Sequence, residues 1–316
     1  MISDTSSYFA DKQVGLIARD MEGSIVVRLK GGLGNQLFQY ATARAMALRS
    51  NVPLKLDVTS GFRNDPFGRS YGLNPFTLKA TPASRFESFV YPGGRVVRAA
   101  SRFFNSRRPL GERSYIQERA LCFDPEIVAF RCRKQIYIEG YWQSEQYFAD
   151  CSEQIRQDFR FMGTPSAQSA QLAHQIEASN SVAVHFRRRR ALRLSGETKG
   201  ADNDTVNANY YSQAFERIAR VVRDPTFFLF SDDPDWVRQN IPLNYSSVVV
   251  TGNESEDRIH EDLWLMTKCD HHILANSTFS WWGAWLSANG EGTVIAPDKI
   301  RFNRDIIPQR WLVLES

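Results

Sequence analysis

One stretch near the start of the chain, residues 25–49, constrains the fold more than any other. A short apolar run at 25–29 leads into three glycines, Gly31, Gly32 and Gly34, and apolar residues at helical spacing follow. Strand, glycine turn and helix form the unit with which an α/β domain brings a ligand onto backbone N–H groups. The stretch therefore predicts an α/β chain that opens on a ligand-facing turn.

The segment before this unit, residues 1–24, is polar and has no regular period, so we expect a flexible N-terminal arm. No apolar run approaches the roughly 18 residues that span a bilayer, and the start has no signal-peptide pattern. The four cysteines lie far apart without a CxxC pair, which favours free thiols in a reducing compartment. We expect a cytoplasmic protein of bacterial type, either soluble or peripheral.

The second half of the chain alternates strands and helices regularly. This alternation predicts a parallel sheet with crossover helices. Gly163-Thr-Pro165 is the expected boundary between an N-terminal Rossmann-like domain at 25–163 and a C-terminal one at 164–316. Residues 61–109 are rich in Phe, Pro, Gly and Arg, which suits long loops that grip a polar ring compound, and a loop-rich cap is the alternative. The expected strands of the second half lie at 181–185, 226–230, 246–251, 272–275 and 293–296.

The glycine turn is an imperfect dinucleotide fingerprint. Leu37 occupies the third small position, although Asp57 lies near the place of a ribose-binding acid. A nicotinamide-dependent oxidoreductase is therefore one open interpretation, and a tight turn without a ligand is another. Asn35 and Gln36 favour a ligand, because two amides at a helix start can hydrogen-bond a sugar or a phosphate.

Basic residues follow the expected strand 181–185. Alternation along the strand places Arg187 on the same side as His185, and a guanidinium can bind a phosphate with two hydrogen bonds. Arg189 and Arg190 are explained equally well as a solvated loop. A non-catalytic nucleic-acid-binding protein could use such arginines with aromatic side chains, but a net charge of only +4 argues against it.

The acids at residues 232–235 allow two explanations. Asp233-Pro-Asp235 resembles a metal-binding DxD motif. A helix start explains the same residues better, because Ser231 or Asp232 can cap it, Pro234 suits its first turn, and acids suit the helix dipole. We therefore predict no metal site here.

A second polar turn lies near the C-terminus. Asn276, Ser277, Thr278 and Ser280 place an amide and hydroxyls between a strand and a helix, where they can hold a phosphate. The three tryptophans that follow are expected to pack in the core. Asp262 stands in an otherwise apolar stretch, where it either pairs with a structural donor or reads the donor edge of a base such as guanine.

Several motifs occur together and in one order. They are Gly31–Tyr40, His185-x-Arg-Arg188, Phe230–Asp233, Leu265-Met266 and Asn276–Leu286. The combination resembles the α-1,2-fucosyltransferases of glycosyltransferase family 11 over about residues 25–300 and, more distantly, the α-1,6- and protein O-fucosyltransferases. The resemblance implies a GT-B fold, in which two Rossmann-like domains face each other across a cleft.

The resemblance also implies an activity. It implies inverting, metal-independent transfer of L-fucose from GDP-β-L-fucose to the 2-hydroxyl of a terminal β-galactoside, in polysaccharide or oligosaccharide synthesis. GDP-fucose is then a donor substrate, no cofactor is required, and the partners are the donor and a galactoside acceptor. Peripheral membrane contact through a membrane-linked acceptor stays open, and nucleic acid is not expected. The natural acceptor and the oligomeric state are also left open.

The resemblance assigns roles to individual residues. Arg187 corresponds to the donor phosphate clamp, and Asn35 lies near the bond that is broken. Arg189-Arg190 replace the usual Gly-Asp of the family, which bears on the acceptor pocket or the loop that covers it. No general base stands out, and the loop candidates are Glu197, Asp202, Asp204 and Glu254. The residues expected to bind the donor are Gly32, Gly34, Gln36, His185, Arg188, Asp262, Asn276, Ser277, Thr278, Phe279 and Ser280.

Overall fold

The chain builds two parallel sheets, one in each half of the sequence. The computed structural model describes residues 23–188, 206–241, 244–253, 255, 258–298, 300 and 304–316. In chain order, its strands and α-helices are β1 (Ile25–Arg28), α2 (Leu33–Ser50), β2 (Leu54–Asp57), β3 (Thr81–Pro82), α3 (Gly94–Ser106), β4 (Tyr115–Gln117), α4 (Pro125–Ala129), β5 (Ile136–Glu139), α5 (Ser152–Asp158), α6 (Ala167–Glu177), β6 (Asn180–Phe186), α7 (Ala208–Val221), β7 (Pro225–Ser231), α8 (Pro234–Asn240), β8 (Ser247–Val249), α9 (Ile259–Lys268), β9 (His271–Ile273), α10 (Thr278–Trp285), β10 (Val294–Pro297) and β11 (Leu312–Leu314).

The first sheet has the order β3-β2-β1-β5-β4 within the described residues. β1 is its centre, with Ile25 aligned on Leu54 of β2 and on Ile136 of β5. Ile25, Val26 and Val27 are all fully buried, as expected for a strand whose two faces are both covered. Ser24 is buried as well, and its carbonyl accepts a hydrogen bond from the Ile136 amide. The end of the predicted arm therefore belongs to the sheet, and residues 1–22 lie outside the described residues.

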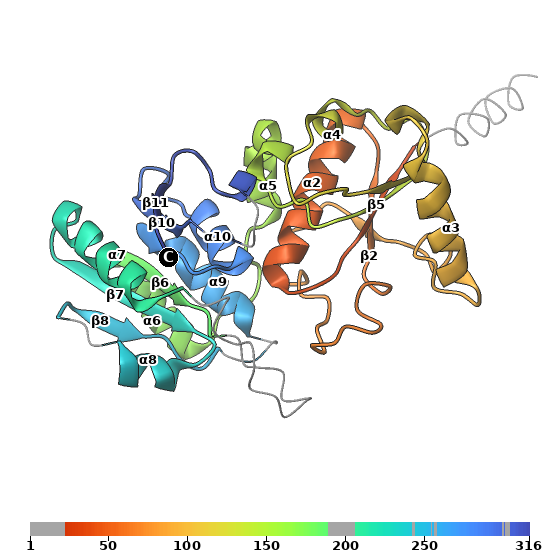
Figure 1. Cartoon of the computed structure of the whole chain (residues 1–316). Helices are drawn as coiled ribbons and strands as arrows, with labels where there is room; N and C mark the ends of the chain where they lie inside the picture. Colours follow the sequence, from red (N-terminus) through yellow and green to blue (C-terminus); the bar gives the residue numbers. More distant parts are fainter. Residues whose placement is uncertain are drawn as a thin grey trace, which may run out of the picture.

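The second sheet has the order β11-β10-β9-β6-β7-β8 in the same described part. Val182 and Val184 of β6 pack with α7, whereas Ala183 packs with α6 and α9 on the opposite face. Helices thus cover both faces, and the predicted alternation of strands and helices is confirmed. The two halves lie side by side in Figure 1, which confirms the expected GT-B arrangement of two Rossmann-like sheets. The boundary at 163–165 falls between the sheets and stays a prediction.

The prediction of a loop-rich cap at 61–109 was wrong in part. Residues 94–106 form the helix α3, whose apolar side chains recur every three or four residues but face solvent. Its isolated helical period was obscured by the glycines, prolines and arginines around it. The short strands β4 and β11 were also missed, because three residues carry too little pattern to be recognised.

Helices α2 and α10 join the two halves. The indole N–H of Trp282 donates to the carbonyl of Gly34 at 3.0 Å, and the ring centroids of Phe38 and Trp281 lie 4.5 Å apart. Trp281, Trp282 and Trp285 are buried, so the predicted core role of the tryptophans is confirmed. These side chains and those around β1 form one continuous hydrophobic cluster.

Candidate active site

Sheet topology identifies the edge at which a ligand is expected. In the second sheet, strand order reverses between β6 and β9, because β7 and β9 flank β6 on opposite sides. Ligands of open α/β sheets bind beyond the carboxyl ends of strands at such a reversal. His185 is the penultimate residue of β6, and Ser277 follows β9 directly before α10. The first sheet reverses in the same way between β1 and β5, beside the glycine turn.

His185 is a buried side chain with an unused nitrogen. Its Nδ1 atom has no hydrogen-bond partner among the described residues, and its ring centroid lies 5.6 Å from that of Phe279. Burial, together with the neighbouring charge of Arg187 and against the opposing effect of Asp232, lowers the pKa of His185 to about 4. The imidazole is therefore neutral near pH 7 and has a ring nitrogen available for a ligand.

Two buried histidines should make the protein less stable in mild acid. Burial holds the pKa of both His185 and His272 at about 4 in the folded state, against 6.5 for an exposed histidine. As pH falls from 6.5 towards 4, the unfolded chain binds protons that the folded chain does not. Each histidine should then cost up to about 1.4 kcal/mol of unfolding free energy per pH unit.

Urea unfolding at pH 7.5, 6.0 and 5.0 measures this loss. His185→Asn should flatten the dependence, whereas the same change at the exposed His174 should leave it as it is. Equal slopes for wild type and His185→Asn would contradict the assignment.

Arg187 forms an ion pair with Asp232. Its Nη1 atom lies 3.2 Å from Asp232 Oδ2, and both side chains stay partly exposed. Asp232 Oδ1 also accepts the backbone N–H of Arg188 at 2.9 Å, which fixes the loop after β6 against the loop after β7. The Arg188 guanidinium stacks on Trp236 at 4.0 Å, so α8 holds it in place. The Arg187 guanidinium is thus held at the carboxyl edge of the sheet by its ion pair with the Asp232 side chain.

The acids that follow β7 cap a helix. Asp233 accepts the backbone N–H of Trp236 at 3.2 Å, and Pro234 is the first residue of α8. The capping explanation is confirmed, although the cap is Asp233 and not Ser231 or Asp232. Among the described residues, no group of three or more His, Cys, Asp or Glu side chains is arranged to hold a metal ion.

The side chains of the polar turn before α10 form many of their hydrogen bonds within the protein. Ser277 caps the helix by accepting the Phe279 N–H at 3.2 Å. Ser280 is fully buried and donates to the Ser277 carbonyl at 3.1 Å, and its predicted contact with the donor stays a prediction. Thr278 Oγ1 donates to Asn35 at 3.2 Å. The direct roles of Asn276, Ser277, Thr278 and Phe279 stay predictions.

Asn35 links the two halves. Its Oδ1 atom accepts hydrogen bonds from Gln143 Nε2 at 2.9 Å and from Thr278 Oγ1. The structure thus brings together two predicted site residues that are 243 positions apart. Gln143 was missed, and nothing in the residues around it signals this contact.

Gln36 and Gly34 have structural roles that sequence reasoning did not identify. Gln36 is buried, donates to the carbonyls of Gly31 and Ser70, and accepts the N–H of Gly72, each at 2.9 Å. Its amide therefore ties a loop to the glycine turn, and the expected contact with the donor stays a prediction. Gly34 lies against the backbone of α10, which explains why a glycine is needed there without a ligand.

Asp262 lies in the first turn of α9, beyond β8. Its Oδ1 atom accepts from Asn253 Nδ2 at 2.9 Å. Burial raises the pKa of the adjacent Glu261, but hydrogen bonds from Ser169, Ser166 and Arg258 outweigh it and lower that pKa to about 2. Asp262 is thus placed at the sheet's carboxyl edge, beside a carboxylate that anchors α6. Its contact with a base stays a prediction.

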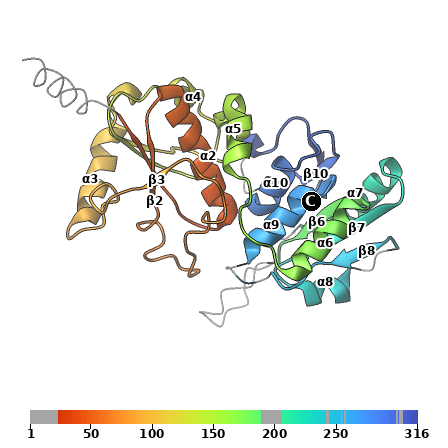
Figure 2. The ribbon, with the colours of Figure 1, turned by 180° about the vertical axis from the view of Figure 1, so that it is seen from behind.

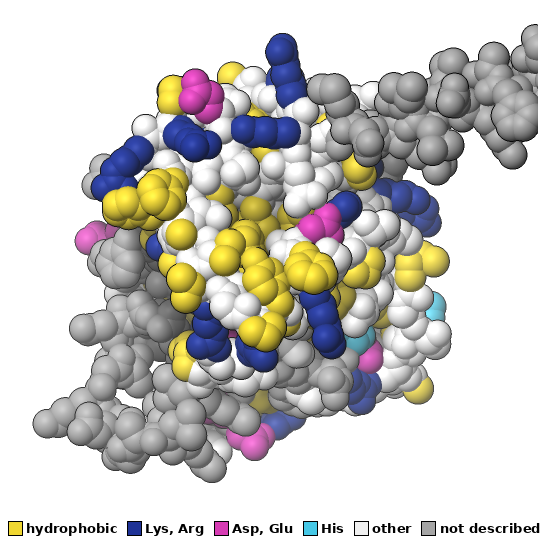
Figure 3. Space-filling model, turned by 90° about the vertical axis from the view of Figure 1, so that its right-hand side faces the viewer, with side chains coloured by type: hydrophobic (Ala, Val, Ile, Leu, Met, Phe, Trp, Pro, Cys, Tyr) yellow, Lys and Arg dark blue, Asp and Glu magenta, His cyan; other side chains and the backbone are white. Residues whose placement is uncertain are grey.

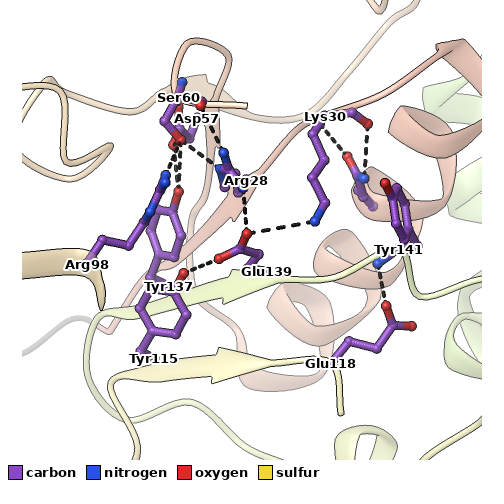
Figure 4. A network of polar contacts seen from close by, with 11 residues as sticks. Arg28, Lys30, Asp57, Ser60, Arg98, Tyr115, Glu118, Tyr137, Glu139 and Tyr141 are labelled. Atoms are coloured by element: carbon purple, nitrogen blue, oxygen red, sulfur yellow. Dashed lines mark hydrogen bonds and ion pairs between the residues drawn. The ribbon is translucent and has the colours of Figure 1, made fainter. Parts of the chain in front are cut away.

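The carboxyl edge of the first sheet carries a basic cavity of about 250 Å³. Figure 4 shows Arg28 between Glu139, with an Nη1–Oε1 distance of 2.5 Å, and Ser60, with an Nε–Oγ distance of 3.0 Å. Arg98 reaches the same Ser60 hydroxyl at 3.2 Å. The residues that line the cavity are Arg28, Ser60, Gly61, Arg63, Asn64, Phe89, Val90, Arg95 and Arg98.

Asp57 lies behind this cavity and has no capacity left for a ligand. It is fully buried and accepts from Tyr137 Oη at 2.6 Å and from the backbone N–H groups of Thr59 and Ser60. The structure therefore does not support the ribose-binding role that an oxidoreductase would need. Sequence reasoning missed the cavity, although an arginine at the end of an apolar strand was a usable signal.

A larger cavity of about 470 Å³, between α7 and β11, touches none of the predicted site residues.

Comparison with known proteins gives consistent matches. The family described as "Glycosyl transferase family 11" matches residues 112–313. "Alpha-1,2-colitosyltransferase" of Escherichia coli is 31% identical over 92% of this chain and 99% of that protein. "O-antigen biosynthesis glycosyltransferase WbnK" of Escherichia coli is 26% identical over 86% and 93%. "Galactoside alpha-(1,2)-fucosyltransferase 1" of Mus musculus is 28% identical over 50% and 43%.

Solved structures give a weaker likeness. The fucosyltransferase NodZ from Bradyrhizobium aligns with a TM-score of 0.46 at 15% identity, over 83% of this chain and 92% of that one. A score below 0.5 adds nothing to the assignment, which depends on the sequence matches.

Proposed function

The chain belongs to glycosyltransferase family 11, and we propose that it transfers L-fucose from GDP-β-L-fucose to the 2-hydroxyl of a terminal β-galactoside. The observation that carries the proposal is the pair of His185 and Arg187 at the strand-order reversal of the second sheet. A neutral ring nitrogen and a positioned cation there match the needs of a nucleoside diphosphate. Asp262, at the same edge, is proposed to read the guanine base.

The proposed mechanism is a single displacement with inversion at the fucose anomeric carbon. Arg187 releases Asp232 and neutralises the charge that develops on the leaving GDP, which stabilises the transition state. The N-terminus of α10 adds its dipole to the same end of the site. Asn35 lies where the two halves meet, and we place it near the bond that breaks.

Metal independence is part of the proposal. Asp233 is engaged as a helix cap and Asp232 as a partner of Arg187, so the acids of this loop already have protein roles. The base candidates Glu197, Asp202, Asp204 and Glu254, and the arginines 189 and 190, lie outside the described residues.

The acceptor is proposed to bind on the side of the first sheet. The basic cavity beyond β1 and β2 offers guanidinium groups, a hydroxyl and the Phe89 ring, a combination that suits a polar sugar ring. This assigns the acceptor to the half at 25–163 and the donor to the half at 164–316.

Four free cysteines support a reducing, cytoplasmic location.

Colitosyl transfer is the second candidate. Colitose is L-fucose without its 3-hydroxyl, and the colitosyltransferase match is 31% identical along nearly the whole chain. The two donors share the GDP group, so the same clamp would serve both. A difference between them must come from contacts to the sugar ring.

Parallel incubation with each donor tests the proposal. GDP-fucose, GDP-colitose and a panel of β-galactosides should give an α-1,2-linked product whose yield does not change when EDTA is added. Linkage analysis by NMR identifies the product, and the ratio of kcat/KM values identifies the preferred donor. Calorimetry should show uptake of GDP and none of NADH. Folded protein that takes up no GDP would refute the proposal.

A further inference from the structure

Helix α3 exposes its apolar face. Val96 is 72% exposed, Val97 44%, Phe103 55% and Phe104 61%. At 100° per residue these four side chains share one side of the helix, together with Ala100 between them. Buried Gly94 and Asn105 attach the opposite side to the protein, and Asn105 Oδ1 accepts the N–H of Ser114 at 2.7 Å. Helix α3 is thus amphipathic, and its apolar side faces solvent.

The segment that carries this face is basic, with its nearest acids in sequence, Glu87 and Glu112, just beyond its two ends. Residues 88–111 contain five arginines and no Asp or Glu. Arg95 and Arg102 project from the flank of α3, and Arg107 and Arg108 follow its end, all four exposed. The Arg107 guanidinium lies 3.6 Å from the centroid of the Phe103 ring, so cation and apolar surface are in contact. The face therefore offers aromatic rings that can enter an apolar layer and guanidinium groups that can bind anions.

The position of α3 leaves this face uncovered by the other described residues. Figures 1 and 2 place α3 at the end of the molecule far from the second sheet. Figure 3 looks onto this end, where hydrophobic side chains gather in the middle and basic side chains lie around them. Phe86, 77% exposed, adds a further aromatic ring to the same segment.

We propose that α3 is a peripheral membrane anchor that lies in the headgroup region of an anionic bilayer. Phe103, Phe104, Val96 and Val97 would enter the boundary between headgroups and acyl chains. Arg102, Arg107 and Arg108 would bind lipid phosphates at the same depth, as basic amphipathic helices do. None of the described helices is long and apolar enough to cross a membrane. The contact is therefore one of a helix lying on the surface.

Two other occupants fit less well. A second copy of this chain, joined through the same face, would bring the same arginines against each other. A protein partner would have to provide a groove for the convex helix and acids along its rim. An anionic bilayer supplies a deformable apolar layer and excess negative charge together, without a dedicated shape.

Vesicle co-sedimentation of the full chain tests the anchor. Wild-type protein should bind vesicles of phosphatidylcholine with 30% phosphatidylglycerol at least about tenfold more tightly than pure phosphatidylcholine, and salt should weaken the binding. Phe103→Ser/Phe104→Ser and, separately, Arg102→Gln/Arg107→Gln/Arg108→Gln should each weaken it about tenfold or more. Val221→Ser, an equally exposed apolar residue on α7, is the matched control and should bind as wild type does.

Circular dichroism and transfer to a soluble acceptor show that each variant is folded. Transfer does not use these residues, so a failed fucosyltransferase assay leaves the anchor test intact. Equal binding to neutral and anionic vesicles would overturn the proposal. So would wild-type binding by Phe103→Ser/Phe104→Ser, or a lipid-free dimer that this variant abolishes.

Discussion

Replacing Arg187 by alanine should lower kcat/KM for sugar transfer by about 10³-fold while leaving the protein folded. The guanidinium is the cation positioned at the carboxyl end of β6, and its partner Asp232 cannot replace it on a diphosphate. Charge that develops on the leaving GDP would then lack its principal counter-charge. Arg187→Lys should recover part of the activity, because it restores the charge but not the paired hydrogen bonds.

Steady-state kinetics with GDP-fucose and urea unfolding together test this expectation. Arg238→Ala is the matched control, since Arg238 also pairs with an acid, at 2.6 Å from Asp235, but this exposed pair lies within α8 and not at the end of β6. The control should keep wild-type kcat/KM. Full activity of Arg187→Ala would remove the clamp from the mechanism.

Replacing Gly34 by alanine should damage stability and activity together. A Cβ atom at residue 34 would lie 2.5 Å from the carbonyl carbon of Thr278 and 2.6 Å from the amide nitrogen of Phe279. Both neighbours are backbone atoms, so α2 and α10 would have to move apart. We expect a loss of about 1–3 kcal/mol in unfolding free energy, typical of overpacking, and a strained Asn35–Thr278 contact.

The control for this change is Gly111→Ala. Nothing lies within 4 Å of a Cβ atom built at residue 111, so alanine there should be neutral or slightly stabilising. Thermal unfolding and transfer assays on both variants separate the effect of crowding from that of losing a glycine. An unchanged melting temperature for Gly34→Ala would show that the two helices are not in firm contact.

The fold was largely predictable because its signals are local. Continuous apolar runs and helical spacing identified the central strands and most helices, and the Asp-Pro pattern identified the start of α8. The sites at strand ends followed from topology: once β6 and β9 were recognised as strands, His185 and Ser277 had to lie at the same edge. That proximity depends on backbone geometry, which sequence periodicity reports well.

The detailed bonding of polar side chains was not predictable. Gln36, Asp57 and Ser280 have the residue types of ligand-binding groups, yet each also makes hydrogen bonds within the protein. Burial decides between the two uses, and burial depends on segments distant in sequence, such as residues 70–72 for Gln36. The basic cavity was missed for the same reason, since its lining comes from separate stretches between residues 28 and 98.

The aromatic seam between α2 and α10 has a consequence for how such enzymes can diversify. Because Phe38, Trp281 and Trp282 belong to a single apolar cluster, separating the two halves would expose apolar surface on both. Heating should therefore melt the whole protein in one calorimetric transition. A chimera that takes one half from this chain and the other from a relative should fold only if the contacting residues of α2 and α10 come from the same parent.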